Sequence, residues 1–384
     1  MPYLTASLPN TSLHMSRRTI SALTMDIMPH ATFFDSASQS PWSLANKLTK
    51  LAVASGADFL GSPQSVALMP TPRSTVFADN GAKLLRFFDG QAGSGQGKPV
   101  VLLVPSMINR WYVLDLRLGA SLIGYLVASG LDVYCVDWGD ARDEDRYLTW
   151  DAVLARLARM VRATRRHSGQ NRVGLLGYCM GATLATIHAA LHPDSVTSLI
   201  NLAGPIDFAS AGVLRHLTDP RWFDVEAIAA AGNVTPTQMQ SGFTAMRPTL
   251  QVAKWVGVAD RFDDLSVEAF AALETWANDN VAFPAAAYRT YITELYQDNR
   301  LIAGMHRVGG SAVDLKAITC PTLVVTASRD TICPPAAATA LLDYCGASRK
   351  VALQVAGGHV GAVIGGKATR ELYPHIAQFV SAGA

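Results

Sequence analysis

Residues 173–185 read VGLLGYCMGATLA, and this stretch decides the fold. It opens with a short apolar run typical of a buried strand and closes with a helical pattern. Between the two, residues 177–181 (GYCMG) place one cysteine between two glycines. A strand that turns sharply into a helix at a nucleophile, the nucleophile elbow, needs minimal side chains two positions to either side. The stretch therefore predicts that Cys179 is a nucleophile on an elbow formed with Gly177 and Gly181.

A free cysteine is most often a buried core residue, so Cys179 taken alone favours a structural role. The two glycines, the strand before it and the helix after it reverse that preference. The N-terminus of the helix favours a thiolate and directs backbone N–H groups at developing negative charge. An oxyanion hole needs two such donors. We expect one from Met180 and the other from the loop after strand 100–104, at Met107, with Ser106 almost as well placed.

Asp330 and His359 are the expected partners of Cys179. Asp330 follows the apolar run 322–326, which places its carboxylate on a loop at the carboxyl end of a strand. A lone Asp before a helix is more often a helix cap, and that alternative stays open. His359 comes after the apolar run 351–355 and two glycines, which leave its imidazole free to reach across the sheet. The order nucleophile, acid, base matches that of α/β-hydrolases.

Composition narrows the class of protein. A chain of 384 residues with 49% hydrophobic residues can bury a substantial core. Charged residues make up only 16%, the net charge is +2, and no long basic block is present, so nothing points to nucleic acid. The apolar runs are shorter than the roughly 20 residues of a spanning helix, so we expect no integral membrane association. Five cysteines without a C-x-x-C pair predict no disulfide framework, no metal site and a reducing, cytoplasmic setting.

From about Thr71 onward, short apolar strands alternate with helical stretches. This pattern is typical of a mostly parallel sheet covered by helices on both faces, and with the elbow it predicts an α/β-hydrolase fold. Strands are expected at 76–78, 83–88, 100–104, 131–136, 173–177, 198–202, 322–326 and 351–355. Helices are expected at 115–129, 149–166, 180–191, 335–344 and in a last segment ending near Phe379.

The alternation breaks after the strand at 198–202. Residues from Gly204 to Gly310 show helical periodicity and no strand pairs of comparable quality, which predicts an inserted helical cap. The expected division of the chain is a weakly patterned extension with one helix at 41–55, two parts of an α/β-hydrolase core, and the cap between them. The extension covers residues 1–70, the two parts of the core cover 71–203 and 313–384, and the cap covers 204–312.

Several motifs in addition to the elbow resemble one family, the polyhydroxyalkanoate synthases, and specifically the short catalytic subunits of the two-component (class III) type. The resemblance runs from about Pro70 to Phe379. The motifs that carry it are INRWYVLDL at 108–116, DVYCVDWG at 132–139, the elbow, VDL at 313–315, CP at 320–321 and GHVG at 358–361.

The resemblance implies an activity. The family's catalytic Cys, Asp and His fall on Cys179, Asp330 and His359, the residues already chosen. Such enzymes join hydroxyacyl groups from coenzyme A thioesters, of the 3-hydroxybutyryl type, into a polyester through an acyl-cysteine, with the thioester as substrate and no cofactor. One departure is Ala182, where these synthases usually carry a second glycine, and its methyl group is expected to crowd the helix against the strand.

The same resemblance implies roles and partners. His359 is expected to deprotonate Cys179 during loading and the attacking hydroxyl during elongation, while Asp330 orients the imidazole. The cap is expected to exclude water from the acyl-enzyme. Its aromatic residues are candidates to line an acyl channel, although plain core is the commoner role for each: Trp222, Phe223, Trp255, Trp276 and Tyr296. We expect a homodimer, a hetero-oligomer with a helical companion subunit, and location at the surface of polymer granules.

Two other functions fit the same motifs. A cysteine-dependent thioesterase or esterase would differ only in using water as the attacking group. A non-catalytic granule-associated subunit would keep the fold without the activity. The intact set of Cys179, Asp330 and His359 argues against the second.

Overall fold

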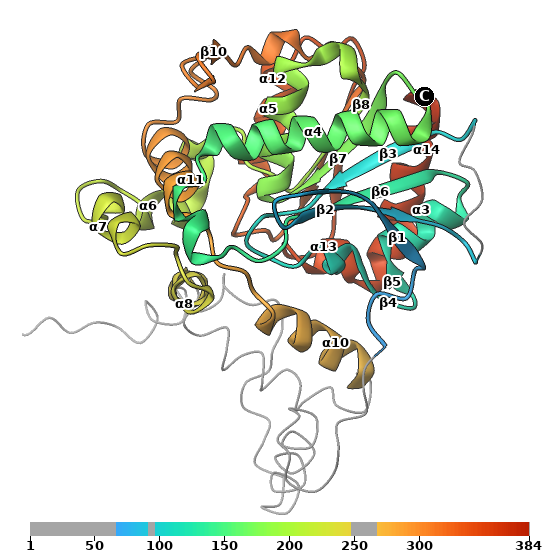
Figure 1. Ribbon diagram of the computed structural model, residues 1–384, viewed down its shortest axis with the longest axis horizontal. Helices are drawn as coiled ribbons and strands as arrows, with labels where there is room; N and C mark the ends of the chain where they lie inside the picture. Colours follow the sequence, from blue (N-terminus) through green and yellow to red (C-terminus); the bar gives the residue numbers. More distant parts are fainter. Residues whose placement is uncertain (1–66, 91–96, 247–266, 384) are drawn as a thin grey trace, which may run out of the picture.

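The computed structural model describes residues 67–90, 97–246 and 267–383 (Figure 1). The helix expected at 41–55 and the aromatic Trp255 lie outside these ranges. Within them, none of the helices is long and apolar enough to cross a membrane.

An eight-stranded sheet forms the centre of the molecule, in the order β1-β2-β6-β3-β7-β8-β11-β12. The β1–β2 and β2–β6 pairs are antiparallel, and every later pair is parallel. The predicted mostly parallel sheet is therefore confirmed. Its strands are β1 (Arg73–Asp79), β2 (Ala82–Phe87), β3 (Val100–Val104), β6 (Asp132–Asp137), β7 (Val173–Tyr178), β8 (Val196–Leu202), β11 (Thr322–Ala327) and β12 (Lys350–Val355).

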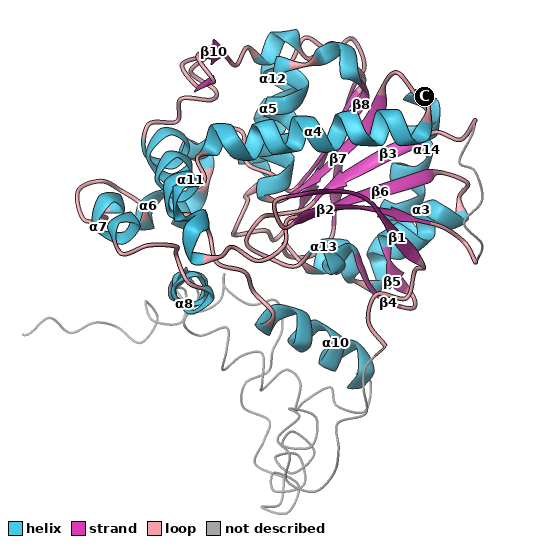
Figure 2. Cartoon of the chain, viewed as in Figure 1, coloured by secondary structure: helices cyan, strands magenta, loops and turns pink. Residues whose placement is uncertain are grey.

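Helices cover both faces of this sheet (Figure 2). One face carries α4 (Trp150–Ser168), α5 (Met180–Leu191) and α12 (Pro335–Tyr344). The other carries α3 (Leu122–Ala128), α13 (Gly361–Ile364), the π-helix at Ala368–Leu372 and α14 (Tyr373–Gly383). Short 3-10 helices lie at Trp111–Leu114, Asp143–Tyr147, Pro193–Ser195, Phe208–Ser210 and Leu315–Ala317.

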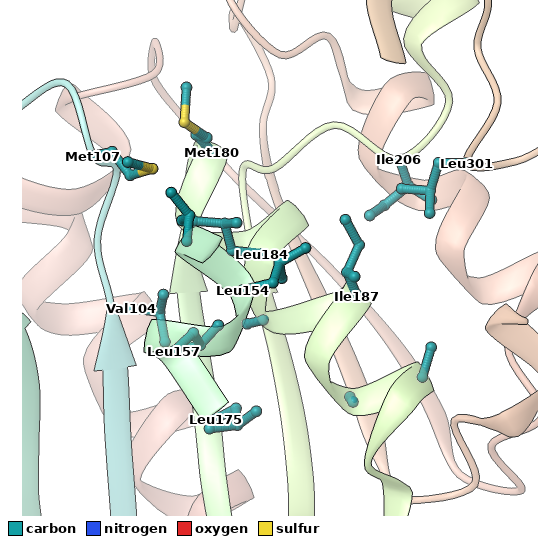
Figure 3. Close-up of a cluster of buried hydrophobic side chains, with 14 of the residues drawn as sticks. Val104, Met107, Leu154, Leu157, Leu175, Met180, Leu184, Ile187, Ile206 and Leu301 are labelled. Atoms are coloured by element: carbon teal, nitrogen blue, oxygen red, sulfur yellow. The ribbon is translucent and has the colours of Figure 1, made fainter. Parts of the chain in front are cut away.

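The central strands are buried on both faces, so they read as continuous apolar runs. In β3, Leu102 and Val104 face α4 and α5, whereas Val101 and Leu103 face the opposite helices. Figure 3 shows the first of these cores, where Leu154 of α4 lies beside Leu184 of α5 and Leu157 of α4 lies beside Val104 of β3. Each fully buried leucine contributes roughly 1.5–3 kcal/mol to folding. This packing holds the amino end of α5 at the carboxyl edge of β3 and β7.

The prediction of a helix at 115–129 is wrong over its first two turns. Residues Asp115–Arg117 and Ala120–Ser121 form the short strands β4 and β5, and α3 begins only at Leu122. Gly119 turns the chain at φ 76°, and Ser121 caps the helix by accepting the N–H of Gly124 at 2.7 Å. Hydrogen bonding by the side chains therefore outweighs the helical periodicity of the segment.

Between β8 and β11 the described chain is mainly helical. Its helices are α6 (Gly212–Leu217), α7 (Val225–Ala230), α8 (Pro236–Met246), α10 (Val267–Asn278), α11 (Ala285–Thr290) and the π-helix η5 (Tyr291–Gln297). A short hairpin adds strand structure that the sequence did not predict. It pairs two strands of two residues each, β9 (Arg307–Val308) and β10 (Ser311–Ala312).

The buried Asp115 joins three segments of the fold. Its carboxylate accepts the backbone N–H of Thr71 at 3.2 Å, the Thr71 hydroxyl at 2.8 Å and the Ser121 hydroxyl at 2.6 Å. Burial raises the pKa of this carboxyl group, and these hydrogen bonds oppose that rise.

Removing Asp115 tests this network. Asp115→Ala leaves two buried donors of Thr71 and the partly buried hydroxyl of Ser121 without their acceptor, so the free energy of unfolding should fall by about 2–4 kcal/mol in urea titrations. Asp194→Ala is the control, because Asp194 is exposed and accepts no hydrogen bond within the described ranges. Equal stability of the two variants would contradict the role given to Asp115.

Candidate active site

Cys179 lies at the junction of β7 and α5 in a backbone conformation that residues other than glycine rarely adopt. Its φ is 57° and its ψ is −130°. Positive φ at a non-glycine residue costs energy, and such strain gathers at functional sites. Its N–H donates to the carbonyl of Leu202 at 3.0 Å, and its own carbonyl accepts the N–H of Ala182 at 2.9 Å. The sharp turn leaves Cys179 partly exposed while its neighbours on either side are buried.

Close contacts between backbones explain the two glycines of the elbow. A Cβ atom on Gly177 would lie 2.2 Å from Cα of Ala182. A Cβ on Gly181 would lie 1.9 Å from the carbonyl oxygen of Val104. Both contacts are far shorter than van der Waals distance and involve backbone atoms, which cannot move aside. Only glycine lets α5 approach β3 this closely.

Ala182 fits because another glycine faces it. A Cβ on Gly204 would lie 2.2 Å from Cβ of Ala182, so the alanine methyl group occupies the space that a side chain at Gly204 would need. Ala182 is fully buried. The crowding expected from Ala182 is thus relieved by the missing side chain of Gly204.

Asp330 holds His359 and a turn at the same time. Its Oδ2 lies 2.7 Å from Nδ1 of His359. Its Oδ1 accepts the backbone N–H groups of Ile332 and Cys333, each at 2.9 Å. The alternative role of Asp330 as a cap therefore applies to Oδ1, which accepts backbone N–H groups. These N–H groups belong to the loop before α12, because the helix itself begins only after Pro334. One carboxylate therefore both fixes its own loop and orients the imidazole.

The His359 imidazole is buried and stacks on the ring of Tyr178, with centroids 5.3 Å apart and planes 25° from parallel. Its Nε2 has no hydrogen-bond partner within the described ranges. Burial alone would lower the pKa of His359, but charge on Cys179, together with the hydrogen bond to Asp330, raises it to about 10. Cys179 is therefore a close neighbour of the imidazole, and negative charge on its sulfur would favour the protonated form of His359.

Met180 and Met107 lie at the same end of the sheet. Met180 is the first residue of α5, and Met107 is on the loop that leaves β3 (Figure 3). Within the described ranges neither backbone N–H donates a hydrogen bond. Both residues are buried. Two unused donors therefore lie near the strand ends that carry Cys179.

A cavity of about 250 Å³ opens at Cys179. Its wall is mostly apolar and comes from the loop after β3, the start of α5, the segment between β8 and β11, and the loop after β11: Ile108, Met180, Leu214, Leu217, Phe223, Ile228, Val234, Met239, Phe283, Ile292 and Ile332. The cavity can accept a short acyl chain beside the thiol.

The aromatic residues expected to line a channel divide into two groups. Phe223 and Tyr296 lie on the cavity wall. Trp222 is 60% exposed, and Trp276 is buried elsewhere, where its indole N–H donates to the carbonyl of Arg110 at 2.9 Å. Tyr291, which the sequence analysis did not select, also lines the cavity. Its five-residue spacing from Tyr296 gives no signal, because on an α-helix such residues face apart.

Comparison with known proteins gives two results. The family described as "alpha/beta hydrolase fold" matches residues 99–361. The chain is 32% identical over 334 residues to the poly(3-hydroxyalkanoate) polymerase subunit PhaC of Allochromatium vinosum, covering 85% of this chain and 93% of that protein. It is 33% identical over 322 residues to the subunit of the same name from Synechocystis sp., covering 81% and 84%.

Solved structures support the fold alone. A hydrolase from Pseudomonas aeruginosa PA01 superposes with a TM-score of 0.51 at 17% identity, covering 80% of this chain and 98% of that one. The sheet, the elbow and these matches define an α/β-hydrolase-fold protein. Within that class, the chain belongs to the family of poly(3-hydroxyalkanoate) polymerase subunits.

The raised pKa of His359 gives stability a defined dependence on pH. The ordinary pKa is 6.5 and the folded value is about 10, so the folded state binds this proton more tightly. The contribution of His359 is complete below pH 6.5 and is lost as pH rises toward about 10. Cys179→Ala removes a source of the rise, so NMR titration of the imidazole should show a lower pKa in that variant.

A second cysteine variant controls for this titration. Cys345 is buried in the core, and Cys345→Ala should leave the pKa of His359 unchanged. If Cys179→Ala and the parent titrate at the same pH, Cys179 is not the neighbour that His359 senses.

Proposed function

We propose that this chain is a polyester synthase that loads hydroxyacyl groups from coenzyme A thioesters onto Cys179 and joins them into a poly(3-hydroxyalkanoate). The observation that carries the proposal is the position of His359, which is hydrogen-bonded to Asp330 and whose pKa is raised by charge on Cys179, a residue that lines an apolar cavity. Membership of the polymerase family supports the substrate class, since its relatives are named for that polymer.

In the loading step, Nε2 of His359 takes the proton of the Cys179 thiol. The thiolate attacks the thioester carbonyl carbon, and the carbonyl oxygen becomes an oxyanion. When the carbon–sulfur bond to coenzyme A breaks, the imidazolium returns its proton to the departing thiolate. Asp330 keeps the imidazole in the tautomer and orientation that this proton transfer needs.

We take Met107 as the second oxyanion donor with Met180, and Ser106 is almost as well placed. The carbonyl of Pro105, which precedes both residues on the loop after β3, accepts the indole N–H of Trp138 at 2.9 Å. The N–H of Ile108 already donates to the Ser106 hydroxyl at 3.4 Å. Within the described ranges the backbone N–H of Met107 donates no hydrogen bond, so it is available to an oxyanion.

Elongation uses the same groups. The hydroxyl of one hydroxyacyl unit attacks the acyl-Cys179 carbonyl, and His359 accepts the hydroxyl proton. An ester bond forms as the carbon–sulfur bond breaks, and the proton passes to the Cys179 thiolate. A thiol suits this sequence of steps because loading transfers the acyl group between two thiolates, which is close to thermoneutral, so the acyl group is still activated when the hydroxyl attacks.

Exclusion of water decides between polymer and free acid. We assign this role to residues 204–312 as a cap on the core formed by 71–203 and 313–384, with 1–70 as an extension. The cap segment supplies Leu214, Phe223 and Met239 to the cavity wall. Because these side chains cover the acyl group with apolar surface, water gains little access to the acyl-enzyme.

Cys179→Ala tests the assignment of the nucleophile. Incubation of purified parent with 3-hydroxybutyryl coenzyme A should release coenzyme A together with insoluble polymer. The alanine variant should lose several orders of magnitude in rate while remaining folded by circular dichroism, because a nucleophile cannot be replaced by binding alone. Release at the parental rate would rule out Cys179. Free 3-hydroxybutyrate without polymer would instead support the thioesterase alternative.

We also propose association with a helical companion subunit, in addition to a homodimer, at the polymer surface. The relatives are named as subunits. Val213 and Trp222 are exposed directly beside the cavity-lining Leu214 and Phe223. A companion bound to this apolar surface could hold the cap open for substrate and product, and so raise the active population.

Co-expression tests the need for this companion. The isolated chain should make polymer weakly or after a long lag, and co-expression with a helical neighbour should remove the lag. The measurement is coenzyme A release over time, with pull-down of the companion. Full, lag-free synthesis by the isolated chain with no companion recovered would remove the case for it.

A further inference from the structure

The π-helix η5 places two tyrosines side by side. Tyr291 and Tyr296 lie at its first and sixth residues. On an α-helix, residues five apart point roughly 140° away from each other. In a π-helix the hydrogen bonds run from i to i+5, so the widened turn brings such residues together, and turns of this kind are frequent at functional sites. Here the two rings meet edge to face, with centroids 5.5 Å apart.

Both side chains belong to the cavity at Cys179. Each is buried and each lies on the cavity wall. Burial raises the pKa of both hydroxyl groups, and charge on Cys179 raises both further, so both stay neutral donors at ordinary pH. They are polar groups in a wall that is otherwise mostly apolar.

The hydroxyl groups of this pair have capacity to spare. Each hydroxyl group affects the pKa of the other, so the two lie close together. Within the described ranges neither donates to the backbone or to a carboxylate. Other buried tyrosines do so: the Tyr373 hydroxyl donates to the carbonyl of Val363 at 2.7 Å. When one hydroxyl of the pair donates to the other, one O–H remains for a ligand.

We infer that the Tyr291–Tyr296 pair binds the hydroxyl group of the acyl chain and selects hydroxyacyl thioesters over plain acyl thioesters at the loading step. The inference rests on the proposed function. An apolar cavity alone would favour the chain without a hydroxyl, because burying a hydroxyl group without a partner forfeits its hydrogen bonds to water. The two tyrosine hydroxyl groups reverse that preference, because they can donate to and accept from the hydroxyl of the bound acyl chain. Other sites that recognise a substrate hydroxyl discriminate in the same way.

The test compares two thioesters that differ only in this group. Single-turnover acylation of Cys179 by 3-hydroxybutyryl coenzyme A and by butyryl coenzyme A is followed by intact-protein mass spectrometry. The parent should load the hydroxyacyl group faster. In Tyr296→Phe the ratio of the two rates should fall about 10-fold, the effect of one lost hydrogen bond, through slower loading of the hydroxyacyl group alone. Tyr291→Phe should lower the ratio by a smaller factor.

Tyr288 supplies the matched control. It lies on the same cavity wall and packs edge to face on Phe283, and burial raises its pKa to about 12 without a contribution from Cys179. Tyr288→Phe should leave the ratio of rates unchanged.

The outcomes separate the two proposals. A parent that neither thioester acylates overturns the proposed function and this inference with it. A parent that is acylated at equal rates by both thioesters overturns the inference alone, whatever the variants do. The inference also fails if both phenylalanine variants slow loading of the two thioesters equally, since the pair would then bind the thioester they share.

Discussion

The close contact between the start of α5 and the end of β3 is the constraint on which the site depends. A side chain at Gly181 would overlap the carbonyl oxygen of Val104, so the helix and the strand touch through their backbones. This contact fixes where α5 begins and holds Cys179 at positive φ. It also sets the N–H of Met180 and the loop carrying Met107 at one end of the sheet. Because backbone meets backbone, no rearrangement of side chains can substitute for the glycine.

The chemistry then depends on a charge arrangement that burial makes strong. His359 would lose its proton readily in an apolar setting, yet Asp330 and Cys179 reverse the effect of burial on its pKa. Asp330 can do this because its second oxygen is held by two backbone N–H groups, so the carboxylate cannot rotate away. The ring of Tyr178, stacked on one face of the imidazole, limits its rotation. Orientation and basicity therefore come from the same few contacts.

We propose that the cavity adds selectivity to this centre. Its apolar wall, drawn largely from the helices between β8 and β11, suits an acyl chain and a water-poor reaction. The π-helix changes one part of that wall, because it turns Tyr291 toward Tyr296 and so places two hydroxyl groups near the thiol. A site of this kind can distinguish substrates by a single polar group, which the core of the fold could not do.

The sequence by itself determined the fold class, the strand-to-helix turn at Cys179 and the family, because glycines at fixed spacing and alternating apolar runs act locally. It also selected Asp330 and His359 by their places after strands, although only the tertiary structure brings these side chains within 2.7 Å of each other. The predicted start of α3 was wrong because Asp115 forms hydrogen bonds with Thr71, which is distant in sequence. Such contacts leave no periodic pattern in the sequence. The fit of Ala182 against Gly204 and the pairing of Tyr291 with Tyr296 were decided by tertiary packing and by a π-helical turn, which no local pattern in this chain indicates.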